Sequence, residues 1–426
     1  MTLAWLVAAV VLLLLLRVPV AFALLLPSLF YVIAAEGISL GVALQRVVIG
    51  LNSFPILAVP LFIMTGYLAN AAGVAERLFR FLTALFGPVR GSLGYVNVVS
   101  SVVFSWMSGA AIADAAGLGA VLVPAMRKRG FRESFALGLT GASSMIGPVM
   151  PPSIPAIVYA VTASVSVGAL FSAGVLPALL LAGILCLYVC LYVSRHPELK
   201  AEPAGELRLL GATVAALPVL GTPVIILGGI LGGVFTPTEA AAVAVVYMLV
   251  LGLAYRSLTL PALHQVLLKT ARTTGSIMLI VAAANLFGWV TAREQAPQLV
   301  TAGMLALTDN PLVFLLLLNV VLLVVGMLLE PVSALLITVP VLTPAAIHFG
   351  IDPLHLGVVM ILNLVLGLLT PPVGLVLYVL GAVSGAPFAQ VVRGVLPFLA
   401  VLFLVLLLVT YVPDVSLLLP RMVGLR

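Results

Sequence analysis

The sequence GPVMPPS at residues 147–153 and its counterpart GLLTPPV at residues 367–373 decide the fold of this chain. Each stretch lies within a long apolar region. A proline inside a helix removes one backbone hydrogen bond and clashes with the carbonyl group four residues earlier. A Pro-Pro pair therefore leaves several carbonyl groups without donors in their own helix, and we predict a broken helix at each stretch.

The rest of the chain has the composition of an integral membrane protein. Of its 426 residues, 63% are hydrophobic and only 8% are charged, and the mean hydropathy is +1.33. In soluble domains roughly half of the residues are apolar and about a quarter are charged. The apolar runs lack the alternation of an outer-membrane barrel. We therefore predict an all-α polytopic membrane protein, with room for roughly ten to twelve crossings. The cations lie in short loops and form no basic domain, so nucleic acid is not expected as a partner.

The two halves of the chain resemble each other. When Pro371 is aligned with Pro151, the motif GVLP at 394–397 falls on the same motif at 174–177. Coinciding Gly and Pro residues carry most weight because they mark the interruptions of helices. The pattern indicates an internal duplication.

The charges indicate that the two copies are inverted. Residues 127–132 (RKRGFR) have the counterpart 347–352 (IHFGID), and Lys and Arg concentrate in short cytoplasmic loops. The matching loops are therefore expected on opposite faces. With 127–132 inside, most other cations also fall inside; those expected outside are Arg46, Arg293, Arg421 and Arg426. Inverted repeats with broken helices are typical of secondary transporters, whose site lies near the bilayer midplane.

A hairpin is expected before each broken helix. SGAAIADAAG at 108–117 interrupts an apolar pair, and its repeat mate is LLEPVSALLI at 328–337. The predicted fold is therefore an inverted repeat with two re-entrant hairpins and two broken helices, an architecture of secondary transporters. Bare carbonyl oxygens at membrane depth need a partner, and sodium is an economical one. Alternatively, each Pro-Pro pair is a simple kink satisfied by Ser, Thr and water.

Few polar side chains lie near these interruptions. Asp114 and Glu330 are ionisable groups in apolar surroundings, and each could ligate a cation or cap the following half-helix, with capping the preferred role. Helix N-termini at the breaks could also receive an anion, which would suit a carboxylate. The candidate substrate contacts are Ser108, Asp114, Ser143, Ser144, Ser153 and Asn363.

The pattern divides the chain into five segments. Scaffold helices are expected to carry surface helices at 74–86 and 258–272 and a cytoplasmic loop at 195–208. The sequence TPTE at 236–239 is expected to cap the start of a helix. The segments are the scaffold at 1–93, the first transport repeat at 94–168, the scaffold at 169–310, the second transport repeat at 311–387 and a C-terminal scaffold helix at 388–426.

Long motifs of the chain resemble a known family. They are VPLFIMTGYLANAAGVAERL (59–78), MSGAAIADAAGLGAVLVPAMRKRGF (107–131), IGPVMPPSIPAIVYA (146–160), GGVFTPTEAAAVAVVY (232–247) and NLVLGLLTPPVGLVLY (363–378). They resemble the large membrane subunit of the tripartite ATP-independent periplasmic (TRAP) transporters, the DctM-type permease. The resemblance implies an elevator-type sodium symporter of the bacterial inner membrane and not an enzyme. It also implies two protein partners, a small four-helix membrane subunit and a periplasmic substrate-binding protein that delivers a carboxylate, such as a sialic acid or a C4-dicarboxylate.

The resemblance further implies about two sodium sites. The implied positions are Ser108, Gly109, Gly147, Pro148 and Pro151 for the first site, and Gly326, Glu330, Leu368, Thr370 and Pro371 for the second. Thr370 is the best side-chain ligand of the second site. The chain departs from the family pattern at Ala110, where a serine is usual, and at Val376, where asparagine is common. These departures leave the substrate and the ion stoichiometry open.

Three other functions stay open at this point. The first is a self-sufficient sodium/anion symporter of the same fold. The second is a channel, although no filter-like repeat or ring of charge is evident. The third is an intramembrane enzyme, although no histidine lies within a predicted span beside Ser108 or Ser144 to act as a base.

Overall fold

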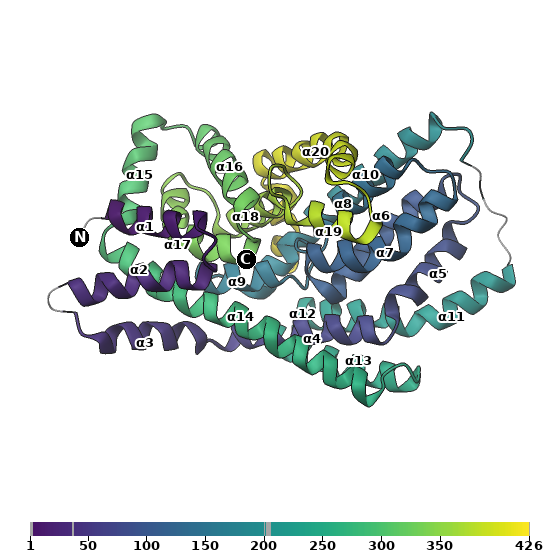
Figure 1. Cartoon of the computed structure of the whole chain (residues 1–426), viewed down its shortest axis with the longest axis horizontal. Coiled ribbons are helices and arrows are strands. Elements are labelled where there is room, and N and C mark those ends of the chain that lie inside the picture. The colour runs from purple at the N-terminus through teal and green to yellow at the C-terminus, as the bar shows by residue number, and fades with distance from the viewer. Residues whose placement is uncertain (1–2, 36–37, 200, 202–205, 426) are drawn as a thin grey trace.

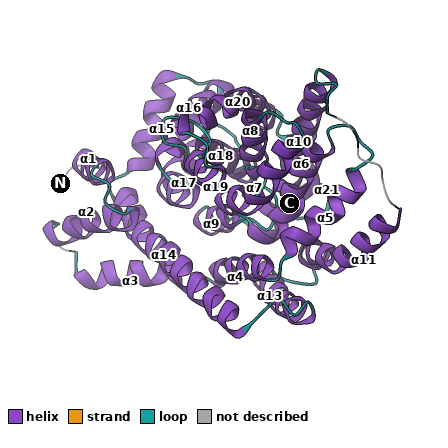
Figure 2. Cartoon of the chain, turned by 45° about the vertical axis from the view of Figure 1, so that its right-hand side comes forward, coloured by secondary structure: helices purple, strands orange, loops and turns teal. Residues whose placement is uncertain are grey.

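The computed structural model describes residues 3–35, 38–199, 201 and 206–425, so residues 200 and 202–205 of the predicted cytoplasmic loop lie outside the described residues. Within these ranges the chain consists of helices and connecting loops, with no strand (Figure 2). Eight of the described helical segments are long and apolar enough to cross a membrane. Shorter apolar helices supply the remaining hydrophobic elements.

The first repeat folds as a hairpin followed by a broken helix. Helices α6 (Ser92–Ser108) and α7 (Ala111–Lys128) form the hairpin, whose tip is Gly109 and Ala110. Helices α8 (Glu133–Ser144) and α9 (Ile154–Thr162) flank the first Pro-Pro pair. The chain between α8 and α9 is not helical, as the two prolines require.

The second repeat has the same plan. Its hairpin consists of α16 (Pro311–Leu328) and α17 (Pro331–His348), and its broken helix consists of α18 (Pro353–Gly367) and α19 (Leu375–Ser384). Helices α16, α17 and α18 each begin with proline, which has no backbone N–H to leave unsatisfied. Helix α17 begins and ends at the repeat positions of α7, so the duplication seen in the sequence is also a duplication of structure.

The two repeats pack on each other through equivalent pairs of helices. Helix α7 packs on α19 of the other repeat, and α17 packs on α9 in the same way. Likewise α8 packs on α20 (Phe388–Tyr411), and α18 packs on α10 (Val167–Ser194). Each contact made by a helix of the first repeat therefore has an equivalent contact made by the matching helix of the second repeat. The predicted fold, an all-α inverted repeat with two hairpins and two broken helices, is confirmed.

The other helices surround the repeats (Figure 1). The longest, α14 (Leu260–Arg293), packs on α2, α3, α4 and α17. The remaining elements are α1 (Leu3–Leu15), α2 (Val20–Ala34), α3 (Leu40–Leu51), η1 (Phe54–Leu57), α4 (Ala58–Ala71), α5 (Val74–Phe86), α11 (Glu206–Pro223), η2 (Val224–Gly228), α12 (Gly229–Leu231), α13 (Pro237–Ala254), α15 (Ala296–Leu307) and α21 (Asp414–Met422).

One helix differs from the sequence-based expectation. Helix α5 has the predicted bounds 74–86, but the expected surface helix at 258–272 is only the first part of α14, which continues through the next apolar run. No proline lies between Pro261 and Pro297 to end the helix. Helix α14 is therefore continuous, with a polar first half and an apolar second half.

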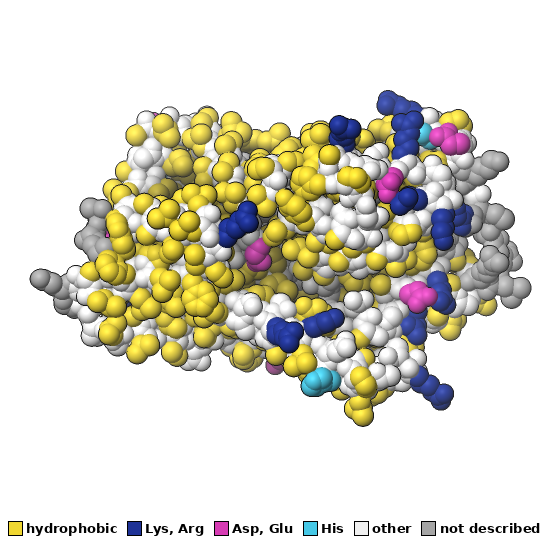
Figure 3. All heavy atoms as spheres, in the orientation of Figure 1, with side chains coloured by type: hydrophobic (Ala, Val, Ile, Leu, Met, Phe, Trp, Pro, Cys, Tyr) yellow, Lys and Arg dark blue, Asp and Glu magenta, His cyan; other side chains and the backbone are white. Residues whose placement is uncertain are grey.

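The surface suits a lipid environment. Large hydrophobic residues are exposed on the outer helices, for example Leu15 and Leu307 with relative accessibilities of 71% and 73%. Figure 3 shows hydrophobic side chains over most of one face, with Lys and Arg gathered toward the end where α5, α10 and α11 lie. Lipid tails cover such apolar surface at no hydrophobic cost.

Candidate functional site

The tip of the first hairpin touches the first break. Gly109 has a φ of +57°, in the left-handed region, and a β-carbon added to it would lie 2.7 Å from the carbonyl oxygen of Pro152. Only glycine allows both that backbone conformation and that approach. The structure therefore brings together two stretches that the sequence places apart.

Asp114 lies in this contact, in the first turn of α7. Its side chain is fully buried, and its Oδ1 accepts a hydrogen bond from the Ser108 hydroxyl. Its Oδ2 has no hydrogen-bond partner in the described chain, and a β-carbon on Gly147 would lie 2.9 Å from it. The capping role preferred from the sequence is wrong for Asp114, because the carboxylate binds a hydroxyl and no backbone N–H of α7.

The first break is enclosed on all sides, since residues 145–153 are buried. Its Pro151–Pro152 peptide bond is cis, as is Pro371–Pro372 in the second break. The Ser153 hydroxyl donates to the Pro148 carbonyl oxygen and accepts from the N–H of Ala156 at 3.1 Å. Ser153 thus caps α9 and closes the break, so its hydroxyl is already engaged on both sides.

Ser143 joins α6 to α8, and Ser144 lies next to it at the end of α8. The Ser143 hydroxyl donates to Oδ1 of Asn97 at 2.8 Å, and Asn97 in turn donates to the Thr140 hydroxyl at 2.7 Å. Ser144 donates to the carbonyl oxygen of Gly141 at 2.8 Å. Both serines are buried; the Ser143 bond holds the hairpin against the broken helix of the same repeat, whereas the Ser144 bond stays within α8.

The second hairpin meets the second break even more tightly. A β-carbon on Gly367 would lie 2.3 Å from the carbonyl carbon of Gly326, and one on Gly326 would lie 2.8 Å from the Leu364 oxygen. Nearby, the Thr370 hydroxyl donates to the Leu366 carbonyl oxygen at 2.8 Å and is buried. The Thr370 oxygen keeps its lone pairs for another partner.

Glu330 has the capping role that the sequence favoured. It is the N-cap residue of α17, and its Oε1 accepts from the N–H of Val332 at 3.0 Å. The Leu368 carbonyl oxygen accepts from the N–H of Val376 at 3.1 Å, which joins the two halves of the break. Pro371 is half-buried and Pro372 is exposed, so the second break is more open than the first.

Ser333 is one of the few polar residues near the second interruption, and the sequence pattern assigns it no role. It lies in the first turn of α17, it is buried, and its hydroxyl has no hydrogen-bond partner among the described residues. The position matches the residue before Asp114 in the first repeat. Each repeat thus has an unpartnered buried oxygen at the start of its second hairpin helix, and only the repeat alignment could have indicated this.

Asn363 belongs to a buried network beside the second break. Its amide donates to Oδ1 of Asn319 at 2.7 Å, and Asn319 donates to the Thr410 hydroxyl at 3.1 Å. His355 lies at 3.1 Å from the Thr410 carbonyl oxygen and at 2.7 Å from the Ser416 hydroxyl. This network links α16, α18, α20 and α21, and the burial of His355 could not be predicted from its place at the start of a helix.

The sequence matches a known protein family over nearly its whole length. The family model for the DctM component of the tripartite ATP-independent periplasmic transporter matches residues 7–415. The chain is 44% identical to the sialic acid TRAP transporter large permease protein SiaM of Vibrio cholerae over 405 residues, which covers 95% of each chain. It is 39% identical to the C4-dicarboxylate TRAP transporter large permease protein DctM of Pseudomonas aeruginosa, over 87% of each chain.

A solved transporter shares the fold. The crystal structure of the Alcanivorax borkumensis YdaH transporter aligns with a TM-score of 0.65 at 18% sequence identity, covering 91% of this chain and 89% of that one. The relatives are permease subunits, so the chain is a transport protein of the bacterial inner membrane with several membrane passes, and it is not an enzyme. The chain belongs to the DctM family, the large permease component of the tripartite ATP-independent periplasmic transporters.

Proposed function

We propose that this chain imports an organic carboxylate together with about two sodium ions. One observation carries the proposal. The buried Oδ2 of Asp114 has no donor and lies beside Gly147, where the first hairpin meets the first break. A buried carboxylate oxygen without a partner costs free energy, and a bound cation removes that cost.

The donor set suits a hard cation. At the first site, the Asp114 carboxylate and the Ser108 hydroxyl lie with the backbone of Gly109 and Gly147, so all available ligands are oxygens. Among the described residues, no three His, Cys, Asp or Glu side chains cluster as a metal site. Sodium, which takes carbonyl and hydroxyl oxygens at broken helices, is the cation this set favours.

The second site would use neutral oxygens. Thr370 supplies a hydroxyl. The Gly326 carbonyl group lies against Gly367, and the Leu364 carbonyl group lies against Gly326. Glu330 uses Oε1 to cap α17. We assign Glu330 to holding the tip and Thr370 to ligating sodium.

Sodium would couple to substrate by ordering the tips against the breaks. If sodium raises the affinity for the anion, the anion raises the affinity for sodium by the same factor. Each net positive charge that enters supplies roughly 2.3 kcal/mol per 100 mV of inward-negative potential. The two repeats, which pack on each other, would move as one block against the surrounding helices in an elevator-type cycle.

We infer the substrate class and the partners from the relatives of the chain. The relatives' names specify sialic acid and C4-dicarboxylate, which share a carboxylate group. We infer that a periplasmic substrate-binding protein delivers such an acid, and that a small four-helix membrane subunit accompanies this chain in the bilayer.

Uptake into proteoliposomes tests this function. Labelled N-acetylneuraminate and succinate are offered with a sodium or a potassium gradient, with and without the binding protein, to the permease reconstituted with its small subunit. We expect uptake only with sodium and the binding protein. Equal uptake in potassium would refute sodium coupling, and uptake without the binding protein would favour the self-sufficient symporter. Conductance that does not saturate would indicate a channel.

A further inference from the structure

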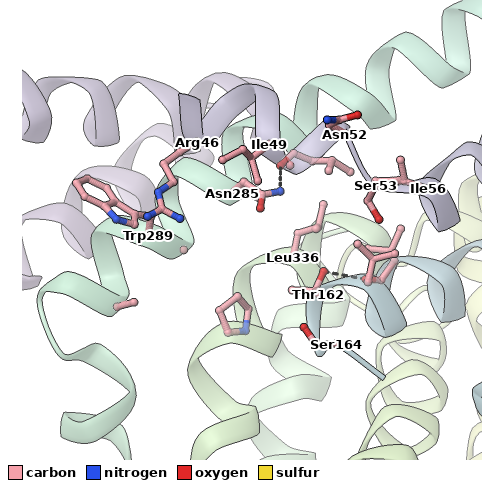
Figure 4. Close-up of a pocket in the computed structure, with 18 residues that line it drawn as sticks. Arg46, Ile49, Asn52, Ser53, Ile56, Thr162, Ser164, Asn285, Trp289 and Leu336 are labelled. Carbon is pink, nitrogen blue, oxygen red and sulfur yellow. Dashed lines mark hydrogen bonds between the residues drawn. The ribbon is translucent and has the colours of Figure 1, made fainter. Parts of the chain in front are cut away.

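A polar cavity lies elsewhere in the molecule, and no residue of the two hairpin tips lines it. It has a volume of about 640 Å³ and is bordered by α3 and α14, outside the repeats, and by α9 and α17, within them (Figure 4). Apolar side chains form much of its wall. The polar and charged side chains that line it are Arg46, Asn52, Ser53, Thr162, Ser164 and Asn285.

Arg46 is the charged residue of this cavity. Its guanidinium carbon lies 5.7 Å from the centre of the Trp289 ring, within cation–π range, and it forms no ion pair within the part of the chain that the structure describes. Figure 4 shows Arg46 beside Trp289, with Thr162 and Ser164 on the facing wall. A planar guanidinium with free N–H groups is suited to bind a carboxylate through two parallel hydrogen bonds.

The local backbone accommodates these polar groups. A β-carbon on Gly50 would lie 2.2 Å from Nδ2 of Asn285, so glycine makes the room that this amide occupies. Asn285 donates to the Val281 carbonyl oxygen at 2.9 Å. Its own carbonyl oxygen can therefore accept from a ligand hydroxyl. Ser164 has a φ of +56°, a conformation that costs a non-glycine residue on the order of 1 kcal/mol.

We propose that this cavity is an anion-binding vestibule, in which Arg46 holds the substrate carboxylate before the substrate reaches the hairpin tips. The inference rests on the proposed transport of a carboxylate. The Trp289 ring packs against the apolar part of the ligand, and Asn285, Thr162 and Ser164 bind its hydroxyl groups. The volume lies in the range of small-molecule sites, roughly 300–1,000 Å³.

The location suits an early step of import. The charge pattern puts Arg46 and Arg293 on the outer side, where the binding protein would release its ligand. Two walls belong to helices outside the repeats and two to the repeats themselves, so movement of the repeats would reshape the cavity. The vestibule therefore binds substrate in one arrangement and releases it toward the tips in another.

Tryptophan fluorescence tests the vestibule directly. The chain has three tryptophans, so the replacements Trp5→Phe and Trp106→Phe leave Trp289 as the only reporter. The full chain in nanodiscs is titrated with N-acetylneuraminate and with succinate. We expect a saturable change in Trp289 emission, and at least tenfold weaker binding after Arg46→Gln. Arg293→Gln is the matched control, because its guanidinium also lies near the Trp289 ring, at 6.0 Å, yet does not line the cavity.

Each outcome decides the proposal. No saturable change with either acid overturns it, as does equal loss in the Arg46 and Arg293 variants or no loss in either. If Arg46→Gln fails to fold, Arg46→Lys replaces it. The affinity for the acid should then fall about threefold to fivefold, since lysine keeps the charge but cannot form two parallel hydrogen bonds with a carboxylate. Unchanged affinity overturns the proposal.

Sodium-driven uptake of the same acids is measured in parallel. Fluorescence binding without uptake would overturn the transport function, whereas uptake without fluorescence binding would overturn the vestibule alone.

Discussion

In the first repeat the Asp114 carboxylate lies in the first turn of the second hairpin helix, α7. In the second repeat the Glu330 carboxylate lies at the hairpin tip and caps the corresponding helix, α17. Asp114 binds Ser108 and leaves one oxygen toward the break, while Glu330 binds the backbone of α17. The two repeats share a backbone plan but not a charge distribution. The comparison teaches that two tips built on one plan need not be equal: in the first a carboxylate oxygen is left without a partner, and in the second the carboxylate caps its own helix.

The packing differs as well. In the second repeat Gly326 and Gly367 let two backbones touch, whereas Trp106 occupies the position of Gly326 in the first repeat. There the hairpin meets the break through Gly109 and the Asp114 side chain. The second tip is therefore fixed by close backbone contact, and the first tip by a buried polar group.

The largest expected effect breaks the backbone contact of the second repeat. In Gly367→Ala the new β-carbon would lie 2.3 Å from the carbonyl carbon of Gly326, and backbone cannot yield as a side chain can. We expect a loss of about 3 kcal/mol or more, seen as little monodisperse protein and a much lower melting temperature. Gly183→Ala, on α10 with no atom within 4 Å, is the control and should melt like the parent. A normal melt for Gly367→Ala would show that the tips are not held this way.

The next largest effect removes the charge of the first repeat. Asp114→Asn keeps the size of the side chain but replaces the free oxygen with a group that repels cations. We expect the sodium concentration for half-maximal uptake to rise about 100-fold, equivalent to about 2.7 kcal/mol. The exposed Asp309→Asn should leave it unchanged. If Asp114→Asn lowers the maximal rate of uptake but leaves the half-maximal sodium concentration unchanged, Asp114 is not a sodium ligand.

A smaller effect is expected at the second site. Thr370→Val keeps the shape and removes one neutral oxygen, so half-maximal sodium should rise about tenfold, or about 1.4 kcal/mol. Thr370→Ser should restore it. Thr213 makes the same bond to the carbonyl four residues earlier, at 2.8 Å, but lies on α11, so Thr213→Val controls for that bond. Equal sodium activation in both valine variants would contradict a ligand role for Thr370.

The smallest expected effect is the loss of the Glu330 cap at the start of α17. Glu330→Ala removes the acceptor for the N–H of Val332 and should cost about 1 kcal/mol of stability, measured as a lower melting temperature. Glu330→Gln keeps an oxygen acceptor and should recover most of it. Sodium activation should change less than twofold in either variant. A tenfold change would assign Glu330 to the second sodium site and make the two repeats more alike.

Local sequence predicted much of the fold. The bounds of α5 and the positions of both breaks agree with the structure. The capping box at Thr236 and Glu239 is also present, with the Glu239 N–H donating to the Thr236 hydroxyl at 3.3 Å. These features depend on neighbouring residues, through missing N–H groups and side chains that reach their own helix. The continuity of α14 was missed because a change of polarity does not end a helix.

The sequence by itself determined the membrane class, the duplication and the interruptions, because hydrophobicity, proline and glycine act within a few residues of their place in the chain. Only the tertiary structure decided that Asp114 faces a break and leaves an oxygen unpaired, that Glu330 caps its own helix, and that Arg46 lies beside Trp289 on one wall of a cavity. Those roles depend on which distant segments touch. Burial and partners arise only when helices pack, and they give chemically similar residues different tasks.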